Sequence, residues 1–306
     1  MIINLFISNF YSYVNYNQAV FQTQGKIEMK KIIVSLGLAL TLSFGATLDE
    51  GEAAYKKGDY KTALTIFEDL ASKNDVKSQY NLGTIYRDGK IVKQDFLKAK
   101  DWYEKAAAQG YTHAQYNLGV IYEYGYGVKQ DYLKAKEWYE KAAAQGFAYA
   151  QYNLGIIYDN GYGVKQDYLK AKEWYEKAAA QGFAYAQYNL GKIYSDGTGV
   201  KQDYLKAKEW YEKAAAQGDA LSQHNLGLIY YYGSGVKQDY LKAKEWWEKA
   251  AAQGDAPAQN NLGILYLNGL GVKQDKIVAK EWYKKACDGE YQQGCNNYKK
   301  LNEQGF

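Results

Sequence analysis

The chain has 306 residues, a formal net charge of only +4, two histidines and two cysteines. Lysines alternate with glutamates along its helical stretches, which is typical of a solvated surface rather than of a track for nucleic-acid phosphates. The two histidines lie far apart, and the sequence contains neither H-x-x-x-H nor C-x-x-C, which are common zinc motifs. We therefore expect no nucleic-acid partner, no metal and no cofactor.

Residues 29–46 have the layout of a secretory signal peptide. Met29-Lys30-Lys31 is followed by an apolar run from Ile32 to Leu42 and by small residues up to Ala46. The run is short for a helix that spans a bilayer, so we expect cleavage after Gly45 or Ala46 and no stable membrane anchor afterwards. The protein would then be periplasmic or secreted. Residues 1–28 precede a complete signal, and we expect them to be untranslated, with translation starting at Met29, or disordered.

From about Val76 the chain repeats itself with a fixed period. The block from Gly127 to Gly155 recurs unchanged from Gly163 to Gly191, 36 residues later. Six Asn-Leu-Gly triplets mark the copies. Such a period predicts a repeat architecture in which each repeat buries its apolar face only against its neighbours, and it argues against a compact enzyme core.

Each repeat is expected to form two helices. In the copy that contains His113, the first helix would run roughly to Glu123 and the second roughly from Asp131 to Gln145. Asp131 is a suitable N-cap, and the glycine after Gln145 is a suitable stop. The spacing of five apolar residues predicts that they share one face of the second helix: Leu133, Ala135, Trp138, Tyr139 and Ala142.

Two further features recur in the repeats. The connector Gly125-Tyr126-Gly127 contains glycines that permit positive-φ turns, and it is interpreted as a helix–helix turn because no strand precedes it, as a phosphate loop would require. A tryptophan column is expected to form core between repeats: Trp102, Trp138, Trp174, Trp210, Trp246 and Trp282.

These patterns resemble a known repeat class. Ala135, Tyr139 and Ala142 match the second helix of tetratricopeptide repeats, and Asn117-Leu118-Gly119 with Tyr122 matches the first. The glycine-rich connector and the 36-residue length are similar to Sel-1-like repeats. The resemblance implies an all-α, right-handed α-solenoid of about seven antiparallel helix pairs. It implies a shorter tetratricopeptide-like first repeat over 47–75, six repeats over 76–289 and a C-terminal capping helix over 290–306.

Cys287 and Cys295 replace an alanine and a glutamine of the preceding repeat, at a helix–helix junction. Neighbouring helices could bring them within disulfide reach, and an exported protein favours the bridge over two free thiols. A cysteine pair eight residues apart is similar to the secreted, cysteine-rich Hcp-type Sel-1-like proteins, which carry such a pair in most repeats. That resemblance also implies weak β-lactamase or penicillin-binding activity as an alternative function. The one S-x-x-K after the signal, Ser234 to Lys237, lies in a connector and has no K-T-G or S-D-N partner.

Columns that vary between repeats are free to specialise. Several match the groove-lining positions of tetratricopeptide proteins, although ordinary surface drift explains them equally well. Glu123, Asp159 and Tyr231 belong to one such column, Lys192 to another, and His113, Tyr149 and Tyr185 to a third. Tyr116, Tyr152 and Tyr188 are further candidates for binding a peptide.

The asparagine column is both polar and invariant: Asn81, Asn117, Asn153, Asn189, Asn225 and Asn261. It aligns with an asparagine that contacts the ligand backbone in peptide-binding tetratricopeptide folds, and an amide can both donate to and accept from a peptide group. Alternatively, each asparagine bonds a neighbouring helix or connector. The sequence thus predicts an exported repeat scaffold that binds a protein or peptide along its concave face, without naming the partner.

Overall fold

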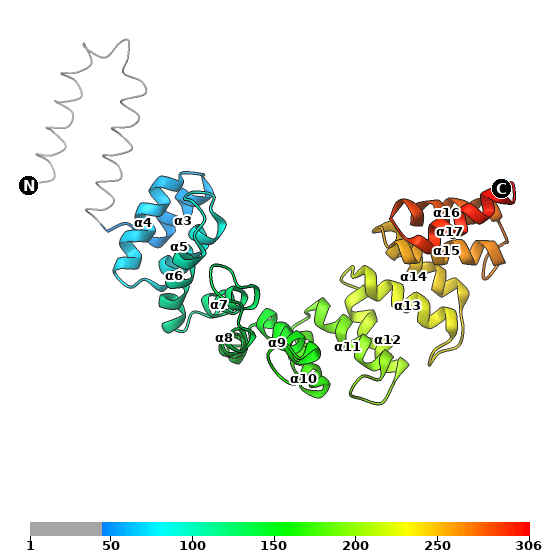
Figure 1. Cartoon of the computed structure of the whole chain (residues 1–306), viewed down its shortest axis with the longest axis horizontal. Helices are drawn as coiled ribbons and strands as arrows, with labels where there is room; N and C mark the ends of the chain where they lie inside the picture. Colours follow the sequence, from blue (N-terminus) through cyan, green and yellow to red (C-terminus); the bar gives the residue numbers. More distant parts are fainter. Residues whose placement is uncertain (1–44) are drawn as a thin grey trace, which may run out of the picture. The chain divides into compact units, whose positions relative to one another are not determined.

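The computed structural model describes residues 45–306, so the predicted signal segment lies almost wholly outside the described residues, and residues 1–28 lie wholly outside them. Within 45–306 the chain forms fifteen α-helices and no strand, and consecutive helices pack in antiparallel pairs (Figure 1). The helices divide into an N-terminal unit, up to Tyr111, and a C-terminal unit, from Thr112 on. The predicted all-α repeat solenoid is confirmed.

Four helices form the N-terminal unit and eleven the C-terminal unit. The former are α3 (Leu48–Lys56), α4 (Tyr60–Ser72), α5 (Val76–Asp88) and α6 (Phe96–Ala108). The latter are α7 (Thr112–Tyr124), α8 (Tyr132–Ala144), α9 (Ala148–Asn160), α10 (Tyr168–Ala180), α11 (Ala184–Asp196), α12 (Tyr204–Ala215), α13 (Ala220–Tyr232), α14 (Tyr240–Ala252), α15 (Ala256–Asn268), α16 (Lys276–Asp288) and α17 (Gln292–Glu303).

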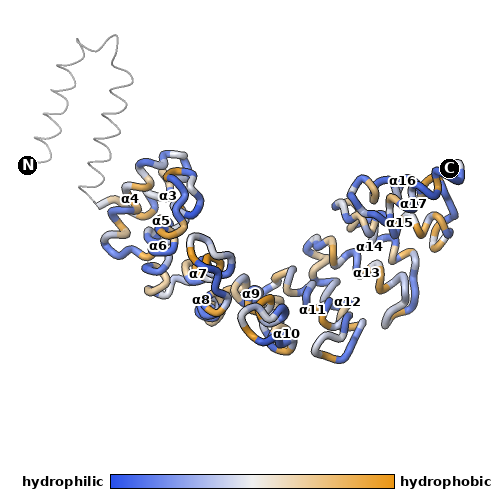
Figure 2. Tube along the Cα trace, in the orientation of Figure 1, coloured by the Kyte–Doolittle hydropathy of each residue, from blue (hydrophilic) through white to orange (hydrophobic). Residues whose placement is uncertain are grey.

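The repeated sequence signals set the helix ends as predicted. Asp131 caps α8 by accepting a hydrogen bond from the backbone N–H of Lys134, at 3.0 Å. Gly125 and Gly127 in the connector have φ of 70° and 69°, where side chains with a Cβ are strained. The tube in Figure 2 shows that hydrophobic and hydrophilic residues alternate along the helices, as expected for helices with one buried face.

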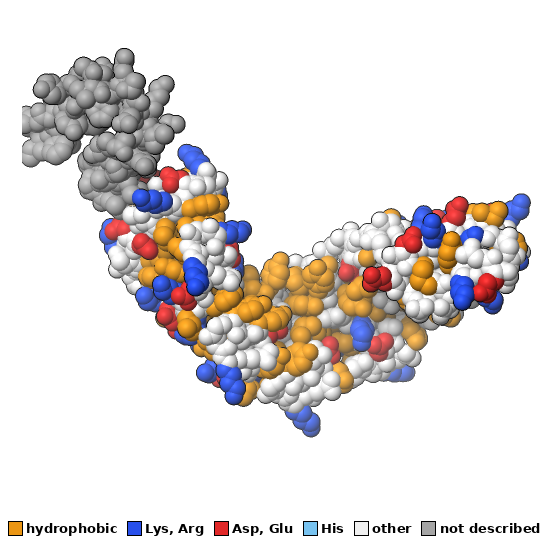
Figure 3. Space-filling view, turned by 45° about the horizontal axis from the view of Figure 1, so that its top comes forward, with side chains coloured by type: hydrophobic (Ala, Val, Ile, Leu, Met, Phe, Trp, Pro, Cys, Tyr) orange, Lys and Arg blue, Asp and Glu red, His pale blue; other side chains and the backbone are white. Residues whose placement is uncertain are grey.

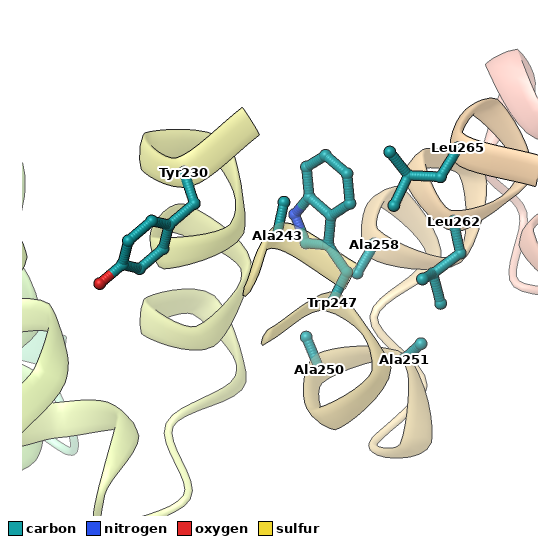
Figure 4. Close-up of a cluster of buried hydrophobic side chains, with 8 residues drawn as sticks. All are labelled: Tyr230, Ala243, Trp247, Ala250, Ala251, Ala258, Leu262 and Leu265. Carbon is teal, nitrogen blue, oxygen red and sulfur yellow. The ribbon is translucent and has the colours of Figure 1, made fainter. Parts of the chain in front are cut away.

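A buried aromatic residue from each second helix fills the centre of each repeat. This column is no more than 2% exposed: Tyr103, Tyr139, Tyr175, Tyr211, Trp247 and Tyr283. The glycine of each Asn-Leu-Gly triplet makes room for that ring, because a Cβ on Gly119 would lie 2.4 Å from Tyr139 Cε1. In the fifth repeat, Trp247 lies among the alanines and leucines of α14 and α15 (Figure 4), and its indole N–H donates to the His224 carbonyl.

One sequence prediction about the second helix was wrong. Leu133 is 54% exposed, because it lies two residues, or about 200° of helix, before Ala135 on the buried face. Trp174 does pack against the core of the preceding repeat, as expected of its column, but it is only half-buried. The Lys177 ammonium covers its ring, 3.8 Å from the centroid. The tyrosine column, not the tryptophan column, is the deepest aromatic core.

Glutamine side chains join consecutive repeats in a ladder. Gln187 of α11 is 5% exposed, donates to the Ala179 carbonyl at the end of α10, and accepts from Gln217 at the end of α12. Equivalent pairs of bonds occur at Gln151 and Gln223. The sequence reasoning missed this ladder, although its glutamines are among the most regular residues of the repeat.

The ladder ends at the last repeat, where a disulfide replaces it. Gln259 donates to the Ala251 carbonyl, but its own oxygen is buried without a partner because Gly289 stands where other repeats have a glutamine. Cys295 and Cys287 occupy the positions of Gln259 and Ala251 one repeat later, and they form the predicted disulfide. A disulfide is typical of an oxidising compartment. Between residues 45 and 306, no helix combines the length and the apolar character needed to cross a bilayer.

Candidate binding face

The first helices of the C-terminal unit carry a continuous run of aromatic rings across three consecutive repeats. We call this run the aromatic stripe and define it by seven residues of α7, α9 and α11 and the turns before them: His113, Tyr116, Phe147, Tyr149, Tyr152, Phe183 and Tyr185. Each ring lies 4.8 to 6.1 Å from the next, centroid to centroid. Hydrophobic side chains gather over the region from α7 to α11 in the space-filling view (Figure 3).

The stripe is exposed at His113, Tyr149 and Tyr185, while its other four rings are half-buried against the repeat cores, and it is confined to a few repeats. Tyr149 is 52% exposed and Tyr185 59% exposed. In later repeats the same columns hold Leu221 and Pro257 in place of these tyrosines, and aspartates in place of Phe147 and Phe183. Because α13 and α15 fold in the same way without the aromatic residues, the repeat does not require them. Sequence reasoning singled out Tyr116 and Tyr152 and placed His113, Tyr149 and Tyr185 in a variable column, but it missed Phe147 and Phe183, whose signal was this restriction to the central repeats.

Glu123 and Asp159 lie at the far ends of α7 and α9, where each bonds the buried tyrosine of its own repeat. The Tyr139 hydroxyl donates to Glu123, and the Tyr175 hydroxyl donates to Asp159 at 3.2 Å. Burial raises the pKa of the Glu123 carboxyl, and the hydrogen bond from Tyr139 acts in the opposite direction. Burial also raises the pKa of Tyr139 and Tyr175, and the adjacent carboxylates add to that effect. Glu123 and Asp159 therefore help to join the two helices of their repeats, whether or not they also bind a partner.

Three other residues that the sequence analysis proposed for binding do not belong to the stripe. Lys192 forms an ion pair with Asp196, 2.9 Å from Nζ to Oδ2, on α11. The Tyr188 ring contacts the buried Tyr211, with centroids 5.9 Å apart. Tyr231 belongs to a separate aromatic group at the end of α13, where it packs 5.3 Å from Trp247.

The asparagines lie half-buried at the junctions between repeats. Asn153 is within hydrogen-bonding reach of the Tyr116 and Tyr139 hydroxyls of the preceding repeat, and Asn189 has the same relation to Tyr152 and Tyr175. Asn225 reaches Tyr188 and donates to its own Leu221 carbonyl at 2.8 Å. These contacts support the alternative in which the column bonds a neighbouring helix, and Asn81, Asn117 and Asn261 occupy the equivalent half-buried positions. Contact with a peptide backbone stays a prediction.

No arrangement typical of hydrolysis appears around the S-x-x-K tetrapeptide. Ser234 to Lys237 lies in the connector between α13 and α14, where the Ser234 backbone N–H donates to the Ile229 carbonyl. The serine and lysine are therefore not one helical turn apart on a helix, as the β-lactamase motif requires. Among residues 45–306, no three metal-ligating side chains come together. His224 instead lies 3.1 Å from Asp255, measured from Nδ1 to Oδ1.

The repeat model of one family matches six consecutive segments of this chain. It is the Sel1 repeat, matched at residues 76–111, 112–147, 148–183, 184–219, 220–255 and 256–291. The chain belongs to the Sel1 repeat family. These boundaries fall at the start of each first helix, and the helix pair α3–α4 precedes the first match. No curated protein matches the chain.

Solved structures of Sel1 repeat proteins are similar to this one. A protective antigen from uropathogenic Escherichia coli, which displays an SLR fold, is 36% identical with a TM-score of 0.79; the match covers 88% of this chain and 64% of the antigen. A Sel1 repeat protein from Oxalobacter formigenes is 37% identical with a TM-score of 0.68, over 79% of this chain and 99% of that one. Helicobacter pylori cysteine rich protein B is 24% identical with a TM-score of 0.34, over 41% of this chain and 95% of that one, which carries no inference about activity.

Proposed function

We propose that this Sel1 repeat protein is an exported scaffold that binds an extended segment of a partner protein along the aromatic stripe. The observation that supports the proposal is a continuous run of aromatic rings that is exposed at His113, Tyr149 and Tyr185 and that the later repeats fold without. Soluble proteins rarely expose large apolar patches without a function, and exposed contiguous rings are typical of interaction surfaces. The single disulfide supports the export that the predicted signal peptide implies.

Tyrosine suits this role on energetic grounds. Its ring provides a large contact area with only two side-chain torsions to order, and its hydroxyl can bond a polar group at the edge of the contact. Tyrosines are accordingly enriched among the residues that dominate binding energy at interfaces. Tyr149 and Tyr185 are the most exposed tyrosines of the stripe, so they should contribute most. Asn153 and Asn189 lie next to the stripe tyrosines and could bond a peptide backbone in addition.

A displayed library of random 12-residue peptides tests the proposal. A chain of that length spans about 40 Å when extended, enough to cross the first helices of three neighbouring repeats. Peptides selected on the wild-type protein should lose about 30-fold or more in affinity for the double variant Tyr149→Ala/Tyr185→Ala, since truncating even one hot-spot residue typically costs 2 kcal/mol or more.

The second helices offer a matched control. Leu133 and Leu169 are 54% and 56% exposed, similar to the two tyrosines, and they lie on second helices rather than on the stripe. The variant Leu133→Ala/Leu169→Ala should therefore bind the selected peptides as well as the wild type does. If no selected peptide depends on the tyrosines, or if the leucine variant loses affinity equally, the stripe is not the binding surface and the proposal fails.

A further inference from the structure

We infer that the segment bound by the stripe is basic: an extended peptide whose arginine or lysine side chains lie across the exposed tyrosine rings and pair with carboxylates of the same helix face. The inference rests on the proposed function and adds the chemistry of the partner. It follows from the distribution of charge, from the position of the carboxylates relative to the rings, and from the exposure of those rings.

The first helices are acidic in a chain that is basic overall. The whole chain carries a formal charge of +4. The paired first helices of the C-terminal unit and the residues that cap them carry one lysine, Lys192, and five carboxylates: Glu123, Asp159, Asp196, Asp219 and Asp255. The formal charge counts the two histidines of these helices, His113 and His224, as neutral. The excess of lysine therefore lies elsewhere, chiefly on the second helices and connectors.

Although Glu123 and Asp159 lie at the far ends of their helices, each acts electrostatically on a half-buried ring of the stripe, Tyr116 or Tyr152. The Tyr116 ring is 5.6 Å from the Tyr139 ring, whose hydroxyl bonds Glu123. The negative charge of Glu123 adds to burial in raising the pKa of Tyr116, and it is the main cause of the raised pKa of Tyr124. In the same way, the negative charge of Asp159 contributes to raising the pKa of Tyr152, and it also contributes to raising the pKa of Lys192. Lys192 forms its ion pair with Asp196. Glu123 and Asp159 are therefore the two carboxylates next to the stripe that have no ion pair with Lys192.

These two carboxylates retain capacity for a ligand. An ionised carboxylate accepts at about four lone-pair sites, and one tyrosine hydroxyl occupies only one of them. A guanidinium donates through a planar fork that fits a carboxylate and also stacks on aromatic faces, which makes arginine the better of the two cations. A cation above a tyrosine ring gains further from the negative π-face.

The rings of the stripe differ from the tryptophans of the second helices in what covers them. On the second helices the chain supplies its own cation: Lys141 lies 3.8 Å from the Trp138 centroid, and Lys177 lies 3.8 Å from the Trp174 centroid. Tyr149 and Tyr185 remain more than half exposed. A cationic side chain from a partner could cover these tyrosine rings in the way that Lys141 and Lys177 cover Trp138 and Trp174.

Charge-neutral, nearly isosteric variants test the inference with the selected 12-residue peptides. Glu123→Gln/Asp159→Asn removes both charges but keeps an oxygen that can accept from each tyrosine hydroxyl. We expect the selected peptides to be rich in arginine and lysine and to bind this variant at least ten-fold more weakly. A peptide with glutamine in place of its basic residues should bind the wild type and the variant equally. Glu137→Gln/Glu173→Gln, on exposed positions of the second helices, is the control and should leave affinity unchanged.

The outcomes separate this inference from the proposed function. Selected peptides that need Tyr149 and Tyr185 but contain no enriched basic residue would overturn the inference and leave the proposed function in place. A peptide set that is independent of the tyrosines would overturn both. A dimer of the protein that Tyr149→Ala disperses would also contradict the inference, because a second copy would then occupy the stripe. The peptide substitution, measured on the wild-type protein, distinguishes these outcomes even if the protein variant fails to fold.

Discussion

Replacing Gln187 by alanine should destabilise the C-terminal unit more than any equivalent change at the end of the glutamine ladder. The side chain of Gln187 donates to the Ala179 carbonyl at 3.3 Å and accepts from Gln217 at 2.8 Å. Each bond contributes about 0.5–1.5 kcal/mol, and truncation also opens a cavity, although the Ala179 carbonyl still accepts from the Gly182 N–H. We expect a total loss of about 2–4 kcal/mol.

Gln259 is the matched comparison within the same chain. Its amide makes one of the two bonds, to the Ala251 carbonyl at 3.2 Å, and its oxygen is buried without a partner. Gln259→Ala should therefore cost only about 1–2 kcal/mol, by the same contribution per bond. The difference between the two variants measures the ladder bond that the last repeat lacks.

Urea unfolding followed by circular dichroism and tryptophan fluorescence provides the measurement. Because repeat arrays need not unfold in one step, the curves should be fitted with separate terms for each repeat and each interface between neighbours. The loss at Gln187 should appear in the interface terms on either side of its repeat. Equal losses for Gln187→Ala and Gln259→Ala, or losses confined to the intrinsic repeat terms, would refute the view that the ladder joins the repeats.

Two further substitutions test the packing of the repeat. Gly155→Ala should cost about 2–3 kcal/mol, because its Cβ would lie 2.4 Å from a ring carbon of the buried Tyr175, whereas Gly182→Ala, which has φ of 84° and open space around it, should cost only about 1 kcal/mol. Similar melting temperatures for the two would contradict this explanation of the Asn-Leu-Gly triplet. Ser222→Ala should raise stability by about 1 kcal/mol, because the buried Ser222 hydroxyl has no partner and four of the other repeats have alanine there; a lower melting temperature would show that the hydroxyl is bonded in solution.

The fold was predictable from the sequence because each local signal recurs in six copies. The Asp131 cap, the connector glycines and the terminal disulfide pair all lie where the sequence placed them. The helix face was harder to assign, because spacings of two to four residues do not by themselves separate Leu133 from the buried positions. The depth of Trp174 and Tyr175 could not be ranked either, since both columns are aromatic and nearly invariant.

The candidate site was predictable only in part. Variation between repeats identified columns of the first helices that could specialise, and Glu123 and Asp159 were found in this way. That they accept hydrogen bonds from Tyr139 and Tyr175 depends on a contact between the two helices of a repeat, which no single column reveals. The phenylalanines of the stripe were missed for a related reason, because Phe147 belongs to a turn position and Tyr149 to a helix position, and only packing brings their rings together, 5.6 Å apart.

Hydrogen exchange measured by mass spectrometry, with and without a selected 12-residue peptide, tests the central claim most directly. If the stripe binds an extended segment, backbone amides of α7, α9 and α11 and of the turns before α9 and α11 should exchange more slowly in the complex. Amides of α14 and α16, on second helices away from the stripe, should exchange at unchanged rates. Protection confined to the second helices or the connectors, with none in α7, α9 and α11, would contradict the account.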